Sequence, residues 1–408
     1  MDRTRFAFKD LRPITIHFDG TIDPRKMDEN REYTMELFFA RPGDVVVAKI
    51  DLKNGAVAVV PDDWQNVVVT GHFAVYEPDR SRILPEYLCR VIQSGFFKAH
   101  LWRNKVGAEG RKEVKLDFFE AERIPIPALP VQRAILDAWE RAQRELAATR
   151  ARIAALEERI EADFLADLGL SKPARAALPK CFAVRWKDLP RWSVLFNQLG
   201  AAGNNLQTGK YPTVELRECL IGTTNGYCIK PVPGPTPHKM LKLSALQPHG
   251  LDLSETKYVK VSPKVAERFH LRAGDLLICR SVGSFDHIAK CALVLNDEPG
   301  VLFPDIIIRA RFNAKIVPEY ARELLQTSAG RRWFQQNART AVGMWKIGGE
   351  DIANFPMPLP PPETQRLLVA KVAKRRAEIA ALRTAAAERE QQAKADVEAM
   401  ILGEKAAT

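Results

Sequence analysis

Two segments of this 408-residue chain have residue types that could support chemistry at a phosphate or a metal. Pro304 and Asp305, with Lys315 downstream, resemble a nuclease frame that binds magnesium between two carboxylates, but Asn313 stands where the second acid is needed. We therefore expect Pro304 to begin a turn that leads into a buried strand.

The segment GNNLQTGKY resembles a phosphate-binding loop. Its glycines, Gly203 and Gly209, are one residue too far apart, and Tyr211 replaces the Ser or Thr that would hold magnesium. We expect no nucleotide site at its lysine, Lys210.

Neither the histidines nor the cysteines form a catalytic or metal-binding pattern. The seven histidines show no HxxxH or HExxH spacing, and the six cysteines form no CxxC pair. The GxSxG, GxGxxG and Asn/Asp-Pro-Pro-aromatic motifs are also missing. We expect a non-catalytic binding protein without a metal or cofactor of its own, and the cysteines indicate a reduced, cytoplasmic thiol set.

Basic and polar side chains that could bind DNA gather in corresponding loops of the two halves of the chain. Lys and Arg supply affinity for phosphates, and polar side chains can contact base edges. In the second half the candidates are Arg280, Ser281, Ser284, Lys290, Arg331, Arg332, Asn337, Arg339, Thr340, Trp345 and Lys346. In the first half they are Lys49, Lys53, Asn54, Arg103, Asn104, Lys105, Arg111 and Lys112. Trp345 could equally be a core residue, and for Trp102 we favour the core.

The net charge of +11 is concentrated in one part of the chain. Residues 171–360 hold 26 basic and 15 acidic residues, whereas residues 1–125 hold 20 of each. A basic excess favours polyanionic partners. The chain has no apolar run of the roughly 18–20 residues that a membrane span needs, so we expect no membrane association.

These loops are positioned by a long internal repeat. Arg41-Pro-Gly-Asp44 before VVVAKI returns as Arg272-Ala-Gly-Asp275 before LLICRS. LPEYLCRVIQSGFFKAHLWRN (84–104) returns as VPEYARELLQTSAGRRWFQQN (317–337), and RIPIPALPVQRAIL (123–136) returns as NFPMPLPPPETQRLLV (354–369). Three blocks in the same order, at offsets of 231 to 233, indicate a tandem duplication.

Each repeat is expected to contain buried strands after the Gly-Asp turn, a short helix, a basic loop, a proline break and a long helix. The short helices are predicted over 84–102 and 317–335. Apolar residues at spacings of four and three predict coiled-coil seams in the long helices. The first seam is Ile135, Trp139, Ala142, Leu146, Thr149, Ile153, Leu156 and Ile160. The second is Leu368, Val372, Ile379, Leu382, Ala386, Val397 and Ile401, and it also contains Arg375 and Arg389.

The helices could pair with each other, or each could fold back on its own domain. We predict an α+β fold with mixed β-sheets in two tandem domains. The domains are expected at 1–125 and 171–357, and the long helices at 126–170 and 358–404.

A proline break of the form PxPLPPxxxQR before a long helix, in two strand-rich repeats, resembles the specificity subunit of type I restriction–modification systems. The matching residues are FPMPLPPPETQRLLVAKV (355–372), the degenerate IPIPALPVQRAIL (124–136) and the two Gly-Asp strand starts. The resemblance implies that the two domains are target recognition domains, each of which reads half of a split double-stranded DNA target. It implies that the helices pair as an antiparallel coiled coil, which fixes the gap and docks DNA methyltransferase subunits. It also implies that those subunits carry S-adenosylmethionine and that a restriction/translocase subunit uses ATP.

The first repeat departs from this pattern because about 40 residues precede its Gly-Asp strand, compared with about 100 in the second. The missing stretch corresponds to RWSVLFNQLG…YPTVELRECLIGTTNGY, so the first recognition domain is expected to be shortened. Two other classes stay open: a scaffold or decoy that binds methyltransferase subunits without reading DNA, and a self-contained nuclease or methyltransferase.

Overall fold

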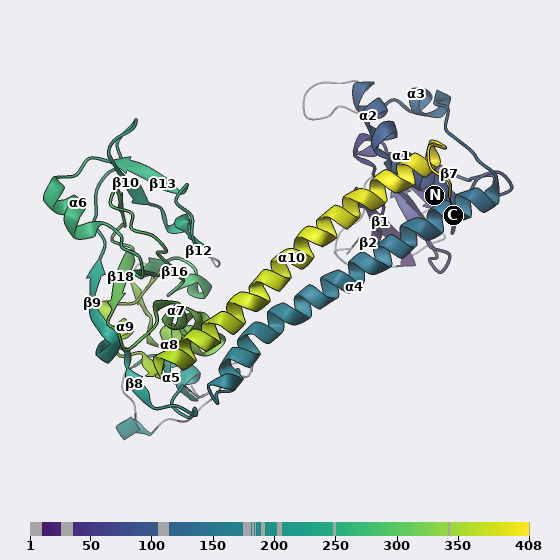
Figure 1. The fold of residues 1–408 in the computed structure, drawn as a ribbon. Helices are drawn as coiled ribbons and strands as arrows, with labels where there is room; N and C mark the ends of the chain where they lie inside the picture. The colour runs from purple at the N-terminus through teal and green to yellow at the C-terminus, as the bar shows by residue number, and fades with distance from the viewer. Residues whose placement is uncertain are drawn as a thin grey trace. The chain divides into compact units, whose positions relative to one another are not determined.

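The fold is described from a computed structural model that covers residues 10–25, 36–104, 114–173, 181, 183, 185–188, 192–201, 206–247, 250–341 and 343–407. The chain forms two compact units. The first consists of Met1–Arg152 and Leu382–Thr408, and the second of Ile153–Ala381. Both long helices, α4 and α10, are divided between the two units (Figure 1). The mixed α+β fold predicted from the sequence is therefore observed.

The described residues of the first unit form two small sheets and three short helices. Strands β2-β1-β6-β3 form one sheet and β5-β4-β7 the other. The strands are β1 (Arg12–Ile16), β2 (Ile22–Pro24), β3 (Leu37–Ala40), β4 (Val45–Ala48), β5 (Val57–Val59), β6 (Val67–Thr70) and β7 (Phe73–Tyr76). The helices are α1 (Pro85–Gln93), α2 (Gly95–Arg103), α3 (Leu116–Ala121) and the long α4 (Leu129–Asp167), and η2 (Leu52–Asn54) is a 3₁₀ turn.

The second unit is built around a four-stranded sheet of order β16-β14-β18-β9. Its strands are β14 (Leu276–Cys279), β16 (Cys291–Leu293), β18 (Ile307–Phe312) and β9 (Leu220–Asn225). Strands β13-β10-β17 and β15-β20-β19 form two smaller sheets, and β11-β12 and β21-β8 form two-stranded pairs. These are β8 (Thr213–Glu215), β10 (His238–Leu241), β11 (Leu246–Gln247), β12 (Gly250–Leu251), β13 (Thr256–Val259), β15 (Ser281–Val282), β17 (Val301–Leu302), β19 (Arg339–Ala341), β20 (Met344–Lys346) and β21 (Pro356–Pro358).

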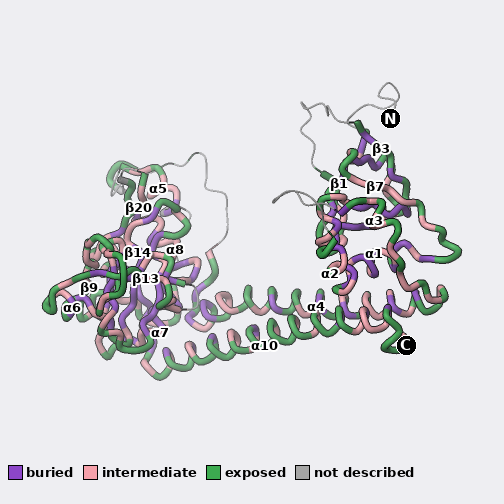
Figure 2. Tube along the Cα trace, turned by 90° about the horizontal axis from the view of Figure 1, so that it is seen from above, coloured by how far each residue is buried: buried purple, intermediate pink, exposed green. Residues whose placement is uncertain are grey.

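Helices surround these sheets. They are α5 (Val194–Ala201), α6 (Pro263–Phe269), α7 (Pro318–Gln326), α8 (Ser328–Asn337), α9 (Gly349–Ala353) and the long α10 (Pro362–Ile401). Short 3₁₀ turns are η3 (Trp186–Asp188), η4 (Leu216–Cys219), η5 (Leu243–Ala245) and η6 (Phe285–His287). The buried positions follow the central strands and the inner faces of α7, α8 and α10 (Figure 2). Pro304 begins a turn before the buried strand β18, as expected.

The Gly-Asp strand starts have the same geometry in both units. Asp44 N–H donates to the Arg41 carbonyl at 3.0 Å, and Asp275 N–H donates to the Arg272 carbonyl at the same distance. The intervening glycines have φ of 82° and 85°, a left-handed conformation that side chains disfavour. Each turn is thus closed by a glycine that the conformation requires, and the next residues enter a central strand.

The strand pairings of the repeats correspond, with one difference. Strand β4 lies between β5 and β7, as β14 lies between β16 and β18. In the second unit β9 continues that sheet beyond β18, and β8 pairs with β21. Among the described residues of the first unit, no strand corresponds to β8 or β9. The stretch that the first repeat lacks therefore corresponds to β9, the fourth strand of the sheet, and to β8, which pairs with β21 beside the proline break.

The predicted single short helices are each two helices. Ser94 separates α1 from α2, and Thr327 separates α7 from α8. Both residues are extended at ψ near 155°, and their hydroxyls cap the next helix by accepting Phe97 N–H and Gly330 N–H. Trp102 is 46% exposed at the end of α2, so its expected place in the core was wrong.

Within each unit, the segments of α4 and α10 lie antiparallel. In the first unit Arg389 Nε lies 2.9 Å from Glu145 Oε2, and Arg150 pairs with Glu390 at 2.9 Å. In the second unit Lys371 pairs with Asp167 at 2.8 Å, and Arg375 pairs with Asp163. The two arginines on the predicted apolar seam, Arg375 and Arg389, therefore face carboxylates of α4.

Candidate nucleic-acid interface

Strand pairing in the second unit joins two loops that lie far apart in the sequence. Strand β15 follows the Gly-Asp strand β14, and β20 follows the helix α8. Ser281 lies opposite Lys346 and Val282 opposite Trp345 in the β15–β20 pair. In the β19–β20 pair, Lys346 also lies opposite Arg339. One small sheet thus collects candidates from both predicted loops.

The cations of this sheet are accessible. Arg339 is 72% exposed and lies 3.5 Å from Asp351, and Lys346 and Thr340 are exposed. Asp351 is 12% exposed and also accepts Gly348 N–H at 2.8 Å, so its carboxylate keeps a hydrogen bond when Arg339 turns to a phosphate. This β15-β20-β19 sheet, with Arg280, Ser281, Arg339, Thr340 and Lys346, is called the basic sheet below.

Residues on the flank of the basic sheet are held by backbone contacts. Arg280 Nη1 donates to the Asp305 carbonyl at 3.3 Å, and the Arg280 carbonyl accepts Ile347 N–H. Ser284 is exposed at the start of η6, and Lys290 is half-buried. The Trp345 ring packs on Phe285 with centroids 4.5 Å apart, so its indole contributes to the core as well as to the sheet.

The candidates on α8 have structural contacts. Arg331 donates to the Asp286 carbonyl of η6, and burial lowers the pKa of this guanidinium. Asn337 donates to the Trp333 carbonyl at 2.9 Å within the helix, and Arg332 is half-buried. Arg331 therefore ties α8 to the loop after the basic sheet's first strand.

In the first unit, three of the described candidates donate hydrogen bonds to nearby backbone carbonyls. Lys49 Nζ donates to the Gly71 carbonyl at 2.9 Å, Lys53 Nζ to the Ile50 carbonyl at 2.5 Å, and Asn104 to the His100 carbonyl at 3.0 Å. Asn54 donates to Asp51 at 3.2 Å, and Arg103 is exposed. Lys105, Arg111 and Lys112 lie outside the described residues.

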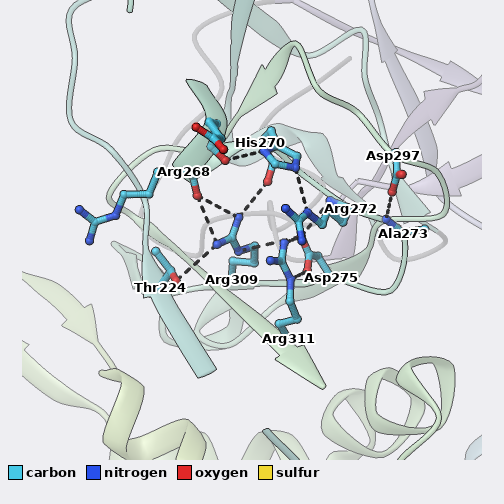
Figure 3. A network of polar contacts seen from close by, with 10 residues as sticks. Thr224, Arg268, His270, Arg272, Ala273, Asp275, Asp297, Arg309 and Arg311 are labelled. Atoms are coloured by element: carbon cyan, nitrogen blue, oxygen red, sulfur yellow. Dashed lines mark hydrogen bonds and ion pairs between the residues drawn. The ribbon is translucent and has the colours of Figure 1, made fainter. Parts of the chain in front are cut away.

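A buried polar network joins the Gly-Asp turn before β14 to β18 and to the end of α6 (Figure 3). Asp275, 1% exposed, accepts two hydrogen bonds from Arg311 at 2.6 and 2.7 Å and one from Arg272 N–H at 2.9 Å. Arg309 Nη1 donates to the His270 carbonyl at 2.8 Å, at the end of α6. This network fixes β14, β18 and α6 relative to one another. The repeated Gly-Asp motif indicated the turn but not these arginines.

Exposed cations on β10, β13 and α6 were not among the predicted candidates. Lys239, Lys257, Lys264 and Arg268 are all exposed, and Lys239 Nζ lies 5.8 Å from the centre of the Tyr258 ring. The sequence signal for these four cations was the excess of basic over acidic residues in 171–360, because the predicted loops contain only part of that excess.

Two further observations concern the metal and nuclease patterns considered from the sequence. Among these residues there is no group of three or more His, Cys, Asp or Glu side chains placed to hold a metal ion. The Asn313 amide donates to the Glu218 carbonyl at 2.9 Å. No described helix is both long and apolar enough to span a membrane.

Comparisons with known proteins agree with the geometry. No protein-family model matches the chain. The chain is 25% identical over 292 residues to the type I restriction enzyme EcoKI specificity subunit of Escherichia coli (strain K12). The match covers 69% of this chain and 58% of that protein, so the chain spans less than two thirds of that relative's length.

Two solved structures share the fold. One, described as the structural basis underlying complex assembly and conformational transition of the type I R-M system, aligns over 96% of this chain and 90% of its own, with TM-score 0.64 and 17% identity. The HsdS subunit from Thermoanaerobacter tengcongensis aligns over 95% and 87%, with TM-score 0.50 and 18% identity. In sequence and in fold, this chain is therefore similar to specificity subunits of type I restriction–modification systems, as its proline junctions and duplicated strand starts indicated.

Proposed function

We propose that this chain is the sequence-specific DNA-recognition subunit of a type I restriction–modification complex. The basic sheet is the observation that carries the proposal, because strand pairing brings Arg339, Lys346 and Ser281 to one accessible surface. Arg and Lys neutralise phosphates, and neighbouring Ser and Thr hydroxyls can contact bases. The similarity to the EcoKI specificity subunit supports the same role.

In this proposal, residues 1–125 and 171–357 each read half of a bipartite double-stranded target. The helices, at 126–170 and 358–404, pair as one antiparallel coiled coil that sets the gap and docks DNA methyltransferase subunits. The ion pairs between α4 and α10 within each unit support this pairing, because they follow an antiparallel register.

The proposed chain is not an enzyme and uses no cofactor for chemistry. Methyl transfer from S-adenosylmethionine and ATP-driven restriction would belong to the methyltransferase and restriction/translocase subunits, in the cytoplasm. The absence of a recognisable catalytic motif in the sequence supports this division.

Methylation mapping in cells that express the complex tests the proposal. We expect one bipartite sequence to be modified, with a fixed gap. In vitro, DNA affinity of the reconstituted methyltransferase complex should fall steeply with salt and should favour that sequence. Loss of all sequence preference would falsify the proposal.

A scaffold that binds methyltransferase subunits without reading DNA is the second candidate. It is favoured by the first unit, which lacks a described counterpart of β8 and β9 and comes from a segment with a net charge of zero. A scaffold predicts methyltransferase binding with no salt-dependent DNA affinity. Metal-dependent cleavage or S-adenosylmethionine binding by the purified chain alone would instead indicate an enzyme.

A further inference from the structure

In the first unit, a cavity of about 690 Å³ contains an arginine that forms no ion pair among the described residues. The corresponding positions of the second unit are occupied by an ion pair. The cavity is lined by the turn Phe18–Thr21, by α1 and α2, and by parts of α4 and α10. Its volume lies in the range of small-molecule pockets, roughly 300–1,000 Å³. None of the sequence motifs draws attention to it.

Arg90 of α1 is the central cation. The face of Trp139 lies 4.8 Å from its guanidinium carbon, and one nitrogen donates to the Asp19 carbonyl at 3.3 Å. Arg90 makes no ion pair with any described carboxylate. Burial lowers the pKa of this guanidinium, because removing it from water disfavours the charged form.

In the second unit, the two corresponding residues carry opposite charges and neutralise each other. In the repeat, Arg90 and Gln143 correspond to Glu323 and Arg376. Glu323 and Arg376 form a two-point ion pair, with distances of 2.5 and 2.8 Å. The first unit has an arginine in place of the glutamate and a glutamine in place of the arginine. Its cavity thus keeps a guanidinium without its carboxylate.

The carboxylates that line the cavity are already engaged. Glu398 accepts Gly95 N–H and Phe96 N–H at 2.8 and 2.9 Å, at the start of α2. Glu390 pairs with Arg150 at 2.9 Å and with Lys394 at 2.7 Å. Asp19 accepts two hydrogen bonds from Thr21. Arg90 and Lys98 therefore form no ion pair among the described residues, and the Asp19 carboxylate acts on Arg90 only through the attraction of its charge, which raises the Arg90 pKa against the larger lowering by burial.

A buried acceptor and an exposed ring complete the cavity. Gln93 donates to the Gly55 and Val57 carbonyls, both at 3.2 Å, which orients its oxygen Oε1 away from them. This oxygen is buried without a hydrogen-bond partner in the described structure. Phe18, 58% exposed, lies on the cavity's edge. A ligand with an anionic group, a donor and a planar ring matches these features.

We propose that Arg90 and Lys98 bind the phosphate group of a nucleotide-sized ligand in this cavity. The guanidinium fork can bind two phosphate oxygens, and the lysine adds a second charge. Gln93 Oε1 accepts a hydroxyl or amino group, and Phe18 offers a face for a base. The phosphate can belong to a free mononucleotide or to the backbone of bound DNA, and the second source rests on the proposed function.

The first experiment is calorimetric titration of the purified full chain with AMP and with inorganic phosphate. We expect saturable binding of AMP, weakened about tenfold or more by Arg90→Gln and by Lys98→Gln. Arg123→Gln, an exposed arginine of the first unit that neither lines the cavity nor belongs to the DNA-binding candidates, is the matched control and should leave AMP binding unchanged.

A charge-supplying variant separates ligand binding from folding. Gln143→Glu places a carboxylate where the second unit has Arg376, beside Arg90, and should raise the thermal midpoint of unfolding while weakening AMP binding. In a merely structural cavity this variant would change stability alone and would leave both AMP binding and the salt dependence of DNA binding unchanged, which would count against the proposal.

A second arm distinguishes the two sources of phosphate. If AMP does not bind but Arg90→Gln and Lys98→Gln both flatten the salt dependence of DNA binding, the phosphate belongs to DNA. If AMP does not bind and that salt dependence is unchanged in both variants, the proposal is overturned. Because the wild-type complex would still select its target in that case, this failure is distinguishable from failure of the proposed function.

Discussion

Gln132 and Gln365 occupy equivalent places in the two units and make the same three hydrogen bonds to the backbone. Gln132 accepts Leu84 N–H at 2.8 Å and donates to the Arg82 and Pro127 carbonyls. Gln365 accepts Val317 N–H at 2.7 Å and donates to the Lys315 and Pro360 carbonyls. Both side chains are fully buried. Each ties the residues before a short helix to the proline break before a long helix, which explains the glutamine in the PxPLPPxxxQR junction.

Replacing Gln365 with Ala should destabilise the second unit by about 3 kcal/mol. The substitution leaves buried backbone donors and acceptors unsatisfied, and each such group costs about 1–3 kcal/mol. Urea unfolding monitored by circular dichroism measures the change. Gln392→Ala, an exposed position on the same helix, should cost less than about 0.5 kcal/mol. Equal effects of the two substitutions would contradict a structural role for the buried amide.

The two Gly-Asp aspartates should differ in their contribution to stability. Asp44 accepts Arg41 N–H at 2.7 Å, whereas Asp275 accepts the equivalent N–H and also pairs with Arg311. Asp275→Asn breaks a buried ion pair and should cost about 3 kcal/mol or more, compared with about 1 kcal/mol for Asp44→Asn. The comparison requires denaturant curves for both variants. Similar losses would mean that the turn hydrogen bond, not the ion pair, dominates.

Most of the repeating scaffold could be predicted from the sequence, because periodic and punctuating residues determine it. The glycines at positions 43 and 274 predict the turns, the β-branched runs predict the central strands, and the proline breaks predict where α4 and α10 begin. The breaks at Ser94 and Thr327 were missed, because a single capping hydroxyl interrupts an otherwise helical pattern.

The candidate site was predicted only in part, because its assembly depends on contacts between distant segments. Each basic loop was visible as a cluster of charges, but the pairing of Ser281 with Lys346 is a tertiary event that periodicity does not encode. For the same reason, the partners of Arg331 and Asp275 could not be predicted. Their carbonyl and guanidinium contacts come from other elements of the second unit.

Substitution of the two exposed cations of the basic sheet should weaken DNA binding. Arg339→Ala together with Lys346→Ala should reduce the slope of log affinity against log salt by roughly two units, because each cation neutralises one phosphate. The measurement is DNA affinity of the reconstituted complex at several salt concentrations. Lys374→Ala, an exposed lysine on α10, serves as the control. An unchanged slope in the double variant would mean that the basic sheet does not face DNA.

Thiol reactivity should separate the six cysteines into two classes. Burial raises the pKa of Cys89 and Cys291 to about 12 and that of Cys279 to about 11, and it raises the pKa of Cys219 in the same direction. Cys181 and Cys228 are exposed. Because the thiolate is the reactive form, a disulfide reagent at pH 8 should modify these two exposed thiols rapidly and the other four only on unfolding.

The same shifts predict a loss of stability in alkali. A thiol whose folded pKa is raised stabilises the fold fully below its unfolded pKa of about 8.5. This contribution is lost as the pH rises towards the folded values near 11 and 12. The unfolding free energy should therefore fall between those limits, and replacing Cys89 with Ser should remove part of that fall. Rapid modification at pH 8 of any of the four buried cysteines would contradict their assignment as buried thiols with raised pKa values.

Strand β7 should exchange its amide hydrogens faster than its counterpart β18. Strand β18 pairs with β14 on one side and β9 on the other, whereas the described residues pair β7 only with β4. In an antiparallel strand, alternate N–H groups point to opposite sides, so half of the β7 amides face no described strand. These amide hydrogens can therefore exchange without separation of β7 from β4.

Hydrogen–deuterium exchange of the intact chain, resolved by peptide, tests this difference. Peptides that span 73–76 should exchange faster than those that span 307–312, while peptides from β4 and β14, which are central in their sheets, should be protected in both units. Equal protection of β7 and β18 would mean that a segment outside the described ranges covers the β7 edge. In that case the strand that the first unit's sheet lacks would be supplied by a part of the chain, or by a partner, that the repeat does not identify.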